Sequence, residues 1–292
     1  MSSMKERLLH LNHCRGIGWQ STLKLLQADP TLASIYSLSS EAVSRLLNIP
    51  QINANLFLKD LHSLKNQDML RHYSGKNVTV LTVFDHEYPE LLRQIYDPPW
   101  VVYLQGNKKV LTEQKKLSVV GTRNPTTYGL DCMEGLLSPL INDKWVIVSG
   151  LAEGIDAKAH KLTLSNNGST IAVIAGGFNH IYPRVNLQLA KRLIEKNLLL
   201  SEYPPATSPQ RWQFPMRNRI ISGLSYGTLI IEAKERSGSL ITANLALGQG
   251  REVFAVPGPI NAPTSTGTNQ LIQAGAKLVL TSEDILSEFS YL

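Results

Sequence analysis

Val146-Ile147-Val148-Ser149-Gly150-Leu151-Ala152-Glu153-Gly154-Ile155-Asp156 is a run of three β-branched residues that passes directly into a loop with two glycines. β-Branched residues favour strands, whereas serine and glycine favour turns. A strand that ends in such a turn and continues into a helical stretch is the repeating unit of parallel α/β sheets. The quoted stretch therefore predicts one strand of such a sheet, followed by a tight loop and a helix.

The same alternation continues on both sides of this stretch, from Asn77 almost to the end of the chain. Further runs with the composition of strands lie at 78–83, 100–104, 117–121, 170–175, 198–201, 227–231, 253–256 and 277–280. Strands that alternate with helices predict a largely parallel sheet with helices on both faces. In such sheets, ligands bind beyond the carboxyl ends of the strands. We assign residues 75–292 to this α/β domain.

Residues 1–74 have a different pattern, because their leucines recur at helical spacing, as at Leu8 and Leu11. The pattern predicts a small all-helical domain, SAM-like or helix-hairpin-helix-like, before the α/β domain. Gly16-Ile17-Gly18, followed by a Ser-Thr-Leu-Lys-Leu-Leu run, resembles one helix-hairpin-helix element, in which helix amides hold a DNA phosphate. An ordinary glycine turn in a helical domain explains the same residues equally well.

The composition is that of a folded globular protein, since 43% of the 292 residues are hydrophobic. A net charge of +6 permits nucleic-acid binding without requiring it. The two cysteines, Cys14 and Cys132, fit neither a disulfide framework nor a zinc site, so we expect no metal. The N-terminus lacks the apolar core of a signal peptide, and no apolar window is long enough to span a membrane. These features predict a cytoplasmic protein.

Four of the predicted strands end in loops rich in glycine and serine. Such loops let backbone amides approach a ligand without a Cβ atom in the way, and the following helix adds the positive end of its dipole. One loop of this kind is weak evidence, whereas four at one edge of a sheet predict a phosphate-lined pocket. The candidate residues in these loops are Gly121, Thr122, Arg123, Ser149, Gly150, Gly154, Gly176, Gly177, Ser237, Gly238 and Ser239.

The segment Phe214-Pro215-Met216-Arg217-Asn218-Arg219-Ile220-Ile221-Ser222 adds two arginines, and no carboxylate lies between Glu202 and Glu232. Arginine is always charged and offers a planar fork of donors that suits phosphate. Arginines with no acid nearby in the sequence predict a site that waits for an external anion. The candidate phosphate- or DNA-binding residues added here are Arg184, Arg211, Phe214, Arg217, Asn218 and Arg219. Trp212, Phe178, Tyr182 and Phe214 lie in the same loops, where they either stack on bases or form pocket walls.

Several other kinds of site are excluded or weakly indicated. The chain has no P-loop, no Gly-x-Gly-x-x-Gly after the first strand and no Gly-x-Ser-x-Gly elbow. Asp156 and His160 are one helical turn apart, which fits either a polarised imidazole or a packed histidine. Asp156 and Glu232 are either paired carboxylates or helix caps and arginine partners.

The chain contains four motifs in a fixed order: Gly-Thr-Arg-x-x-x-x-Tyr-Gly, Ser-Gly-Leu-Ala-x-Gly-Ile-Asp, Phe-Pro-x-Arg-Asn-Arg-Ile-Ile-Ser-Gly-Leu and Arg-Ser-Gly-Ser-Leu-Ile-Thr-Ala. These motifs closely resemble those of the DprA/Smf family of DNA-processing proteins. The resemblance covers about residues 77–280. It implies an extended Rossmann-like fold that binds single-stranded DNA and loads the RecA recombinase on it during natural transformation. It also implies a homodimer without catalytic residues or cofactor. The apolar stretches 240–247 and 271–280 are candidate dimer contacts, and ordinary helix-to-sheet packing explains most of the same residues.

Carried onto this sequence, the resemblance places the basic pocket at Arg123, Arg184, Arg211 and the Arg217/Arg219 pair, with Arg251 as a weaker candidate. Many members of the family carry a C-terminal winged-helix-like domain, which this sequence of 292 residues is not expected to contain. The alternative function is a nucleotide-binding or phosphoribohydrolase-like enzyme that uses the same pocket. That alternative lacks the Pro-Gly-Gly-x-Gly-Thr loop, because Ala175-Gly176-Gly177-Phe178 has no following Gly-Thr.

Overall fold

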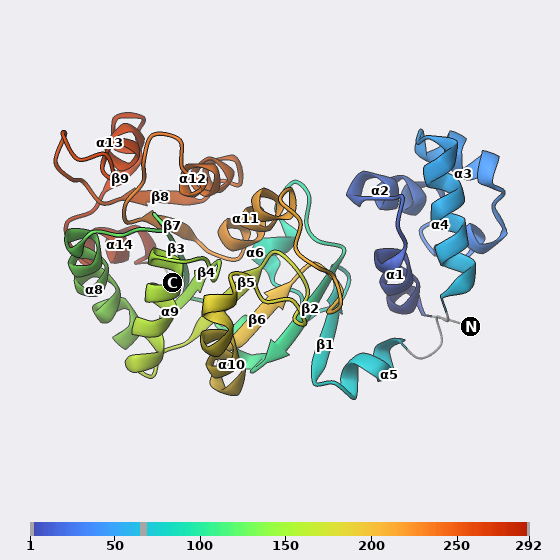
Figure 1. Cartoon of the computed structure of the whole chain (residues 1–292), viewed down its shortest axis with the longest axis horizontal. Coiled ribbons are helices and arrows are strands. Elements are labelled where there is room, and N and C mark those ends of the chain that lie inside the picture. The colour runs from blue at the N-terminus through green and yellow to red at the C-terminus, as the bar shows by residue number, and fades with distance from the viewer. Residues whose placement is uncertain (1–2, 65–68, 291–292) are drawn as a thin grey trace. The chain divides into compact units, whose positions relative to one another are not determined.

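The structure is a computed structural model that describes residues 3–64 and 69–290 (Figure 1). The α-helices are α1 (Met4–His13), α2 (Trp19–Ala28), α3 (Ser40–Leu47), α4 (Gln51–Ser63), α5 (Met69–Ser74), α6 (Glu90–Arg93), α7 (Lys109–Thr112), α8 (Thr127–Asn142), α9 (Ile155–Ser165), α10 (Leu187–Lys196), α11 (Gln213–Gly223), α12 (Gly238–Gly248), α13 (Thr266–Gln273) and α14 (Glu283–Leu286). The strands are β1 (Val78–Thr82), β2 (Val101–Gly106), β3 (Lys116–Val120), β4 (Val146–Ser149), β5 (Thr170–Ile174), β6 (Leu198–Ser201), β7 (Gly227–Ile230), β8 (Glu252–Ala255) and β9 (Lys277–Leu278). Each predicted strand is present, although β9 is shorter than its sequence pattern predicts.

Spatial contacts divide the chain into two compact units. The first contains Met1–Tyr88 and Pro99–Tyr103, and the second contains Pro89–Pro98 and Leu104–Leu292. The first unit therefore holds β1 and the start of β2 as well as the predicted helices. These contact units do not test whether residues 1–74 and 75–292 fold as separate domains, so that boundary stays a prediction.

The sheet of the second unit is parallel and follows the order β6-β5-β4-β3-β7-β8-β9. From β3, the chain adds β4, β5 and β6 on one side, and then returns to add β7, β8 and β9 on the other. The direction of winding thus reverses between β3 and β7. Beyond the carboxyl ends of these two strands lies the crevice in which sheets of this class bind their ligands.

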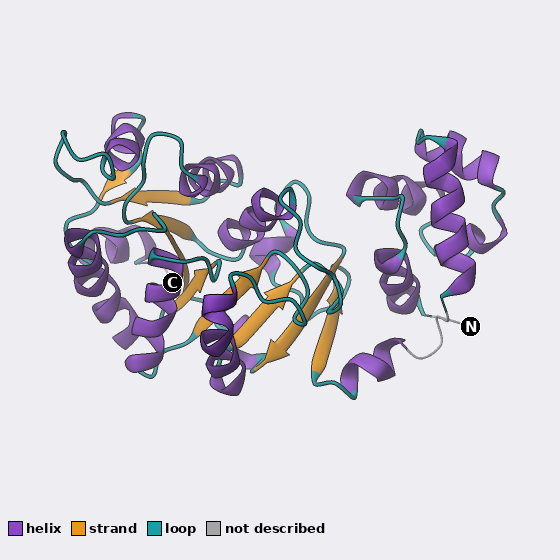
Figure 2. Cartoon of the chain, viewed as in Figure 1, coloured by secondary structure: helices purple, strands orange, loops and turns teal. Residues whose placement is uncertain are grey.

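Helices cover both faces of this sheet (Figures 1 and 2). The side chains of β3 point alternately to one face and to the other. Leu117 and Val119 are fully buried in the core that α8 and α9 share with the strands. Ser118 points to the opposite face, where its hydroxyl is hydrogen-bonded to the Ile221 carbonyl oxygen (2.7 Å) and the Ser225 hydroxyl (2.8 Å). The predicted architecture, helices on both faces of a largely parallel sheet, is confirmed.

The first unit contains the predicted helical segment. Its α1 begins with a capping box, in which the Ser3 hydroxyl accepts from the Glu6 amide (3.3 Å) and Glu6 Oε2 accepts from the Ser3 amide (2.6 Å). Gly16 has φ +82, and a Cβ atom there would lie 2.4 Å from the Asn53 carbonyl oxygen. This close contact with α4 explains Gly16 structurally, and phosphate binding by the following helix stays a prediction.

His160 of α9 lies in the core of the second unit and has no exposed surface. Its Nδ1 donates to Thr170 Oγ1 (2.7 Å), because that hydroxyl gives its own proton to the Ile147 carbonyl. Nε2 has no hydrogen-bond partner among the described residues. Burial, together with the charge of Arg217, lowers the pKa of His160 to about 3. His160 is a neutral packed residue, so the hypothesis of an imidazole polarised by Asp156 is wrong.

Replacement of His160 by glutamine tests this assignment. Below pH 6.5, the ordinary pKa of histidine, His160 is protonated in the unfolded chain. In the folded chain it becomes protonated only near pH 3. The free energy of unfolding of the wild type therefore falls as pH decreases through this window. We expect H160Q to take up about one proton fewer on unfolding than the wild type. Its free energy of unfolding, measured with urea between about pH 4 and 6, should therefore change less steeply with pH. Parallel slopes in the two proteins would contradict the assignment.

Candidate functional site

A pocket of about 360 Å³, here called the main pocket, lies at the point where the winding reverses. Its walls come from the loops after β3, β4, β5 and β7, and from the first turns of α11. The four predicted loops therefore meet at one edge of the sheet. Residues more than one hundred positions apart, such as Arg123 and Lys234, line the same hollow.

Three exposed cations surround the main pocket: Arg123 after β3, and Lys234 and Arg236 after β7. None of them has an ion-pair partner within the described ranges. Arg123 was predicted as a site residue, whereas Lys234 and Arg236 were not. A cation after a strand carries no pattern of its own, although Arg236 directly precedes the predicted Ser237-Gly238-Ser239 loop.

Arg217 of α11 forms the floor of the main pocket and is 6% exposed. Its Nη1 donates to the carbonyl oxygens of Gly150 and Val173, and its Nε donates to Asn218 Oδ1 (3.2 Å). Burial lowers the pKa of Arg217 to about 10, and nearby Asp156 opposes this shift. Arg217 therefore remains charged at neutral pH, and Nη2 has no hydrogen-bond acceptor among the residues that the structure describes.

Asp156 accepts hydrogen bonds from backbone amides that were predicted to bind a ligand. Its Oδ2 accepts from the backbone amides of Gly150 (3.1 Å) and Ala152 (3.4 Å) in the loop between β4 and α9. Asp156 is 6% exposed, and burial raises the pKa of its carboxyl group despite the opposing charge of Arg217. A side chain of the protein itself thus already occupies these two amides. Asp156 anchors the loop and interacts with the charge of Arg217, as the arginine-partner interpretation predicted, but it does not cap α9.

The structure corrects the roles of Ser149 and Gly154. Ser149 is fully buried, and its hydroxyl donates to the Val119 carbonyl of the neighbouring strand (2.6 Å). Gly154 has φ +76, and a Cβ atom there would lie 2.3 Å from the Thr122 carbonyl oxygen. Both residues hold the two loops together, and neither lines the main pocket.

The loop after β3 lines the pocket, but much of its backbone is engaged internally. The Thr122 amide donates to the Glu232 carbonyl (2.8 Å), and the Thr122 carbonyl accepts from the Ile155 amide (3.1 Å). A Cβ atom on Gly121 would lie 2.7 Å from the Ile155 side chain. Gly121 is required by close packing, whereas the Arg123 side chain and the Thr122 hydroxyl remain open to a ligand.

Gly176 and Gly177 permit the close approach of another segment rather than of a ligand. A Cβ atom on Gly177 would lie 2.2 Å from the Pro204 carbonyl oxygen, and one on Gly176 would lie 3.0 Å from Pro209. The Gly177 amide donates to the Thr207 carbonyl (2.8 Å). Neither glycine lines the main pocket, which corrects their assignment as phosphate ligands.

The start of α12 fits the predicted anion site better. Ser237, Gly238 and Ser239 line the main pocket, and the Ser237 hydroxyl lies 2.7 Å from the Ser239 hydroxyl without capping the helix. The amides of Gly238 and Ser239 have no partner among the described residues, as expected in the first turn of a helix. These amides and the helix dipole favour an anion at this position.

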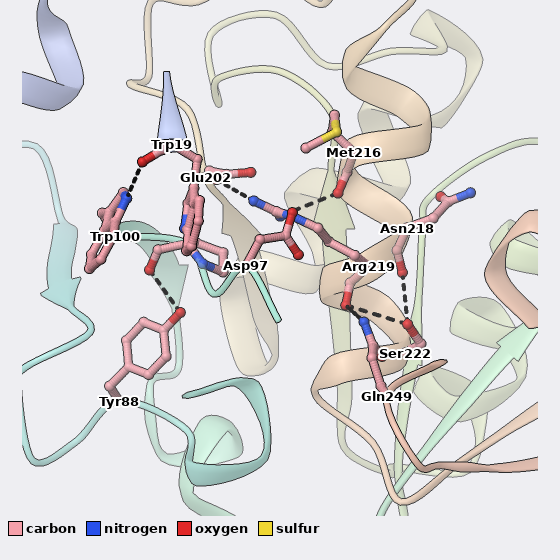
Figure 3. A network of polar contacts seen from close by, with 11 residues as sticks. Trp19, Tyr88, Asp97, Trp100, Glu202, Met216, Asn218, Arg219, Ser222 and Gln249 are labelled. Atoms are coloured by element: carbon pink, nitrogen blue, oxygen red, sulfur yellow. Dashed lines mark hydrogen bonds and ion pairs between the residues drawn. The ribbon is translucent and has the colours of Figure 1, made fainter. Parts of the chain in front are cut away.

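Arg219 is neutralised inside the protein (Figure 3). Its Nε lies 2.9 Å from Asp97 Oδ2 and its Nη2 lies 2.7 Å from Glu202 Oε1, while its side chain is 4% exposed. The absence of acids between Glu202 and Glu232 in the sequence did not exclude such partners in space. Arg219 does not line the main pocket, so the prediction that it waits for an external anion is wrong.

Glu232 anchors the start of α8, because Oε2 accepts from the Thr126 amide (2.9 Å) and Oε1 from the Thr126 hydroxyl (2.7 Å). It is 2% exposed and does not line the main pocket. Glu232 therefore holds Thr126, the N-cap residue of α8, and is itself neither the cap of that helix nor an arginine partner among the described residues. Arg251 is engaged as well, since its Nη2 donates to the Leu91 carbonyl (2.8 Å).

A second hollow of about 430 Å³, here called the Arg211 hollow, lies beside the main pocket and is lined by Arg123, Tyr182, Pro209, Arg211 and Phe214. Tyr182 and Phe214 also line the main pocket. Phe178 packs against the core that α10 covers and lines neither hollow, so the structure does not place it as a pocket wall. Trp212 is 61% exposed and touches Tyr203 edge-to-face, and Arg184 is exposed outside both hollows. DNA contacts of Trp212 and Arg184 stay predictions.

In the described ranges, no group of three or more histidine, cysteine or acidic side chains is arranged to hold a metal ion. None of the described helices is both long enough and apolar enough to cross a membrane.

The chain is similar to proteins that process DNA. Residues 79–290 match the family model of the DNA recombination-mediator protein A. DNA processing protein DprA of Bacillus subtilis is 46% identical over 268 residues, which make up 91% of this chain and 89% of that protein. The X-ray structure of DNA processing protein A from Streptococcus pneumoniae aligns with a TM-score of 0.83 and 36% identity, over 99% of this chain and 98% of that chain. DNA processing protein A from Helicobacter pylori, described for its unique single-stranded DNA binding mode, aligns with a TM-score of 0.66 and 30% identity, over 73% of this chain and 96% of that chain.

The ion pairs of Arg219 predict that this residue acts on stability. Replacement by methionine leaves Asp97 and Glu202 as partly buried, unpaired carboxylates. We expect R219M to lose about 3 kcal/mol of unfolding free energy at pH 7, measured by urea denaturation. Exposed Arg192 of α10 provides the matched control, and R192M should change stability little. An R219M protein of wild-type stability would contradict this role.

Proposed function

Because the chain belongs to the DprA/Smf family of DNA-processing proteins, we propose that it binds single-stranded DNA in the main pocket and loads a RecA recombinase on the strand, without catalysing a reaction itself. The observation that carries the proposal is the ring of unpaired cations around the main pocket. Arg123, Lys234 and Arg236 lie at its rim, and charged Arg217 lies at its floor.

The rim and the start of α12 together suit a phosphodiester backbone. Each exposed cation that neutralises a phosphate releases counterions, which makes binding favourable and sensitive to salt. The open amides of Gly238 and Ser239 add donors that need no particular base. Such contacts predict binding that depends little on sequence. The single-stranded DNA binding of the Helicobacter pylori relative supports the same ligand.

A single strand fits this site better than a duplex. In a single strand, both phosphates and bases are open to the protein, and single-strand sites commonly combine cations with aromatic rings. The main pocket offers this combination, since Tyr182 and Phe214 line it together with the cations. A duplex keeps its bases paired and presents its phosphates outside, so it would contact the rim cations but not the aromatic rings.

The arrangement of carboxylates supports a binding function over the enzymatic alternative. Glu232 is bonded to Thr126 and lies outside the main pocket. Asp156 faces the pocket, but its Oδ2 is engaged by two loop amides. A phosphoribohydrolase-like reaction needs a carboxylate that is free to act on a bound nucleotide. Neither Glu232 nor Asp156 offers this, so the enzymatic alternative depends on exposed Glu153 at the rim, which has no hydrogen bond within the described ranges.

We also propose a homodimer and a cytoplasmic location, both of which the family resemblance implies. The stretches predicted as dimer contacts carry exposed apolar side chains: Ile241 is 44%, Leu247 54%, Leu278 40% and Leu280 71% exposed. Exposed apolar side chains are available for protein contacts, although Ile241 also lines the main pocket. Light scattering on the purified chain measures its mass directly. The recombinase contact rests on the family resemblance alone.

The rim cations predict a specific salt dependence. We expect the triple variant R123A/K234A/R236A to bind single-stranded DNA more weakly and to lower the slope of log affinity against log salt by about 2, because each lost phosphate contact removes about 0.7. Fluorescence anisotropy with a labelled oligonucleotide of about 16 nucleotides, titrated at several salt concentrations, measures both quantities. A duplex of the same sequence, run alongside, should bind more weakly.

The control is K191A/R192A on the exposed surface of α10, which removes charge away from the main pocket. This variant should keep most of the wild-type slope. Equal slopes for the wild type and the triple variant would contradict the proposed binding site.

A further inference from the structure

We propose that His10 and His13 form a pH-sensitive switch in the first unit, which holds α1 in place at neutral pH and releases it on mild acidification. The inference concerns this unit alone and does not rest on the proposed function. Both histidines lie in the last turn of α1. Residues three positions apart share one face of a helix, so the two rings face the same neighbours. Each ring is hydrogen-bonded to a tyrosine from another element.

His13 connects α1 to α5 through a hydrogen bond that needs a neutral imidazole. Its Nδ1 donates to the Leu9 carbonyl oxygen (2.7 Å), because a carbonyl oxygen can only accept. Nε2 therefore carries no proton and accepts from the Tyr73 hydroxyl (2.6 Å). A proton on Nε2 would occupy this acceptor, and the hydroxyl proton of Tyr73 would lose its partner. Protonation of His13 thus breaks the hydrogen bond in its present form.

Tyr73 extends this connection to the start of β2. Its ring contacts that of Tyr103 edge-to-face, with centroids 5.4 Å apart and planes at 71°. Tyr103 is fully buried, and its hydroxyl donates to Oδ1 of Asn12 (2.7 Å), the residue before His13. The end of α1, α5 and the start of β2 are therefore joined by one closed series of contacts. Loss of the His13 bond opens this series.

His10 lies in a position that admits the neutral ring only. Its side chain is 1% exposed and stacks on Tyr36, with ring centroids 5.7 Å apart. Nδ1 lies 3.0 Å from the Tyr36 hydroxyl, and Nε2 has no hydrogen-bond partner among the described residues. An imidazolium has an N–H group on both nitrogens. Protonation would therefore bury a charge together with an N–H group that has no acceptor.

The neutral groups that face the two rings supply no compensating charge. Burial raises the pKa of Tyr73 to about 12 and that of the Cys14 thiol to about 12, so neither ionises near neutral pH. Burial also raises the pKa of Tyr36 and that of Tyr103. The hydroxyl and thiol groups around the switch are thus uncharged at every pH at which histidine titrates.

The charged neighbours oppose protonation or are already paired. The carboxylate whose charge reaches Cys14 is that of Asp60 on α4, and it accepts from Arg15 Nε (2.8 Å) and Nη2 (2.7 Å). The other titratable neighbours are bases, namely Arg7 beside Tyr36, His62 on α4 and His72 beside Tyr73. A proton on either ring of the switch would therefore add positive charge to a site that lacks a free carboxylate among the described residues.

These surroundings determine the sign of the pH dependence. Burial and the charges of His13 and His62 lower the pKa of His10, against the effect of the Leu64 backbone, and burial lowers the pKa of His13. Released α1 therefore binds protons below about pH 6.5 that packed α1 excludes. Between about pH 7.5 and 5.5, each histidine favours release by up to about tenfold. Stability of the first unit thus falls as pH decreases through this window.

Hydrogen–deuterium exchange of the full chain tests the switch, with rates corrected for the intrinsic pH dependence of amide exchange. We expect the protection of α1 amides to fall by about tenfold or more between about pH 7.5 and 5.5. The double variant H10Q/H13Q, whose side chains form hydrogen bonds without titrating, should keep nearly the same α1 protection at both pH values. Peptides of α8, in the second unit, should respond to pH equally in the two proteins.

His86 provides the matched control, because it is an exposed histidine of the same unit. H86Q should show the wild-type fall in α1 protection. Wild-type α1 protection that does not change with pH would overturn the switch, as would equal falls in the wild type and in H10Q/H13Q. A second measurement needs no variant: nitrogen-15 chemical shifts of the His10 and His13 rings in the folded wild type should show both rings neutral at about pH 6. Half-protonation of both rings near pH 6.5 in the folded chain would contradict the proposal.

Discussion

The buried guanidinium of Arg217 is the constraint on which the site depends. A cation removed from water needs acceptors, and Arg217 finds them in the carbonyl oxygens of Gly150 and Val173, at the ends of two neighbouring strands. These bonds tie α11 to the edge of the sheet. Nearby Asp156 partly offsets the charge while binding two loop amides. The pocket floor is therefore a fixed polar arrangement, assembled before any ligand arrives.

This constraint divides the work among the loops. The amides between β4 and α9 serve Asp156, and the glycines after β5 serve the crossing of the Pro204–Pro209 segment. Open donors remain at the start of α12 and on the exposed cations at the rim. Two adjoining hollows share Arg123, Tyr182 and Phe214, which come from the loop after β3, the loop after β5 and the start of α11. A site of this kind suits a flexible, multiply charged strand.

Much of the fold could be predicted from the sequence, because β-branched runs and glycine turns are local signals. The meeting of four loops at one edge followed from the parallel sheet. The prediction for Arg219 was wrong because its ion-pair partners Asp97 and Glu202 are distant in the sequence and come close only in the folded chain. The structural requirement for glycine at position 177 could not be predicted either, because it depends on the tertiary contact with Pro204. Lys234 was missed because a single lysine after a strand has no distinguishing pattern.

The central claim is that a single strand lies over the main pocket. Photo-crosslinking of a single-stranded oligonucleotide that carries 5-iododeoxyuridine, followed by mass spectrometry of the crosslinked peptides, tests it most directly. The account predicts crosslinks in the peptides that contain Tyr182 and Phe214, and their loss in excess unlabelled single strand but not in excess duplex. Crosslinks confined to the helices of residues 3–64, with none in those two peptides, would contradict it.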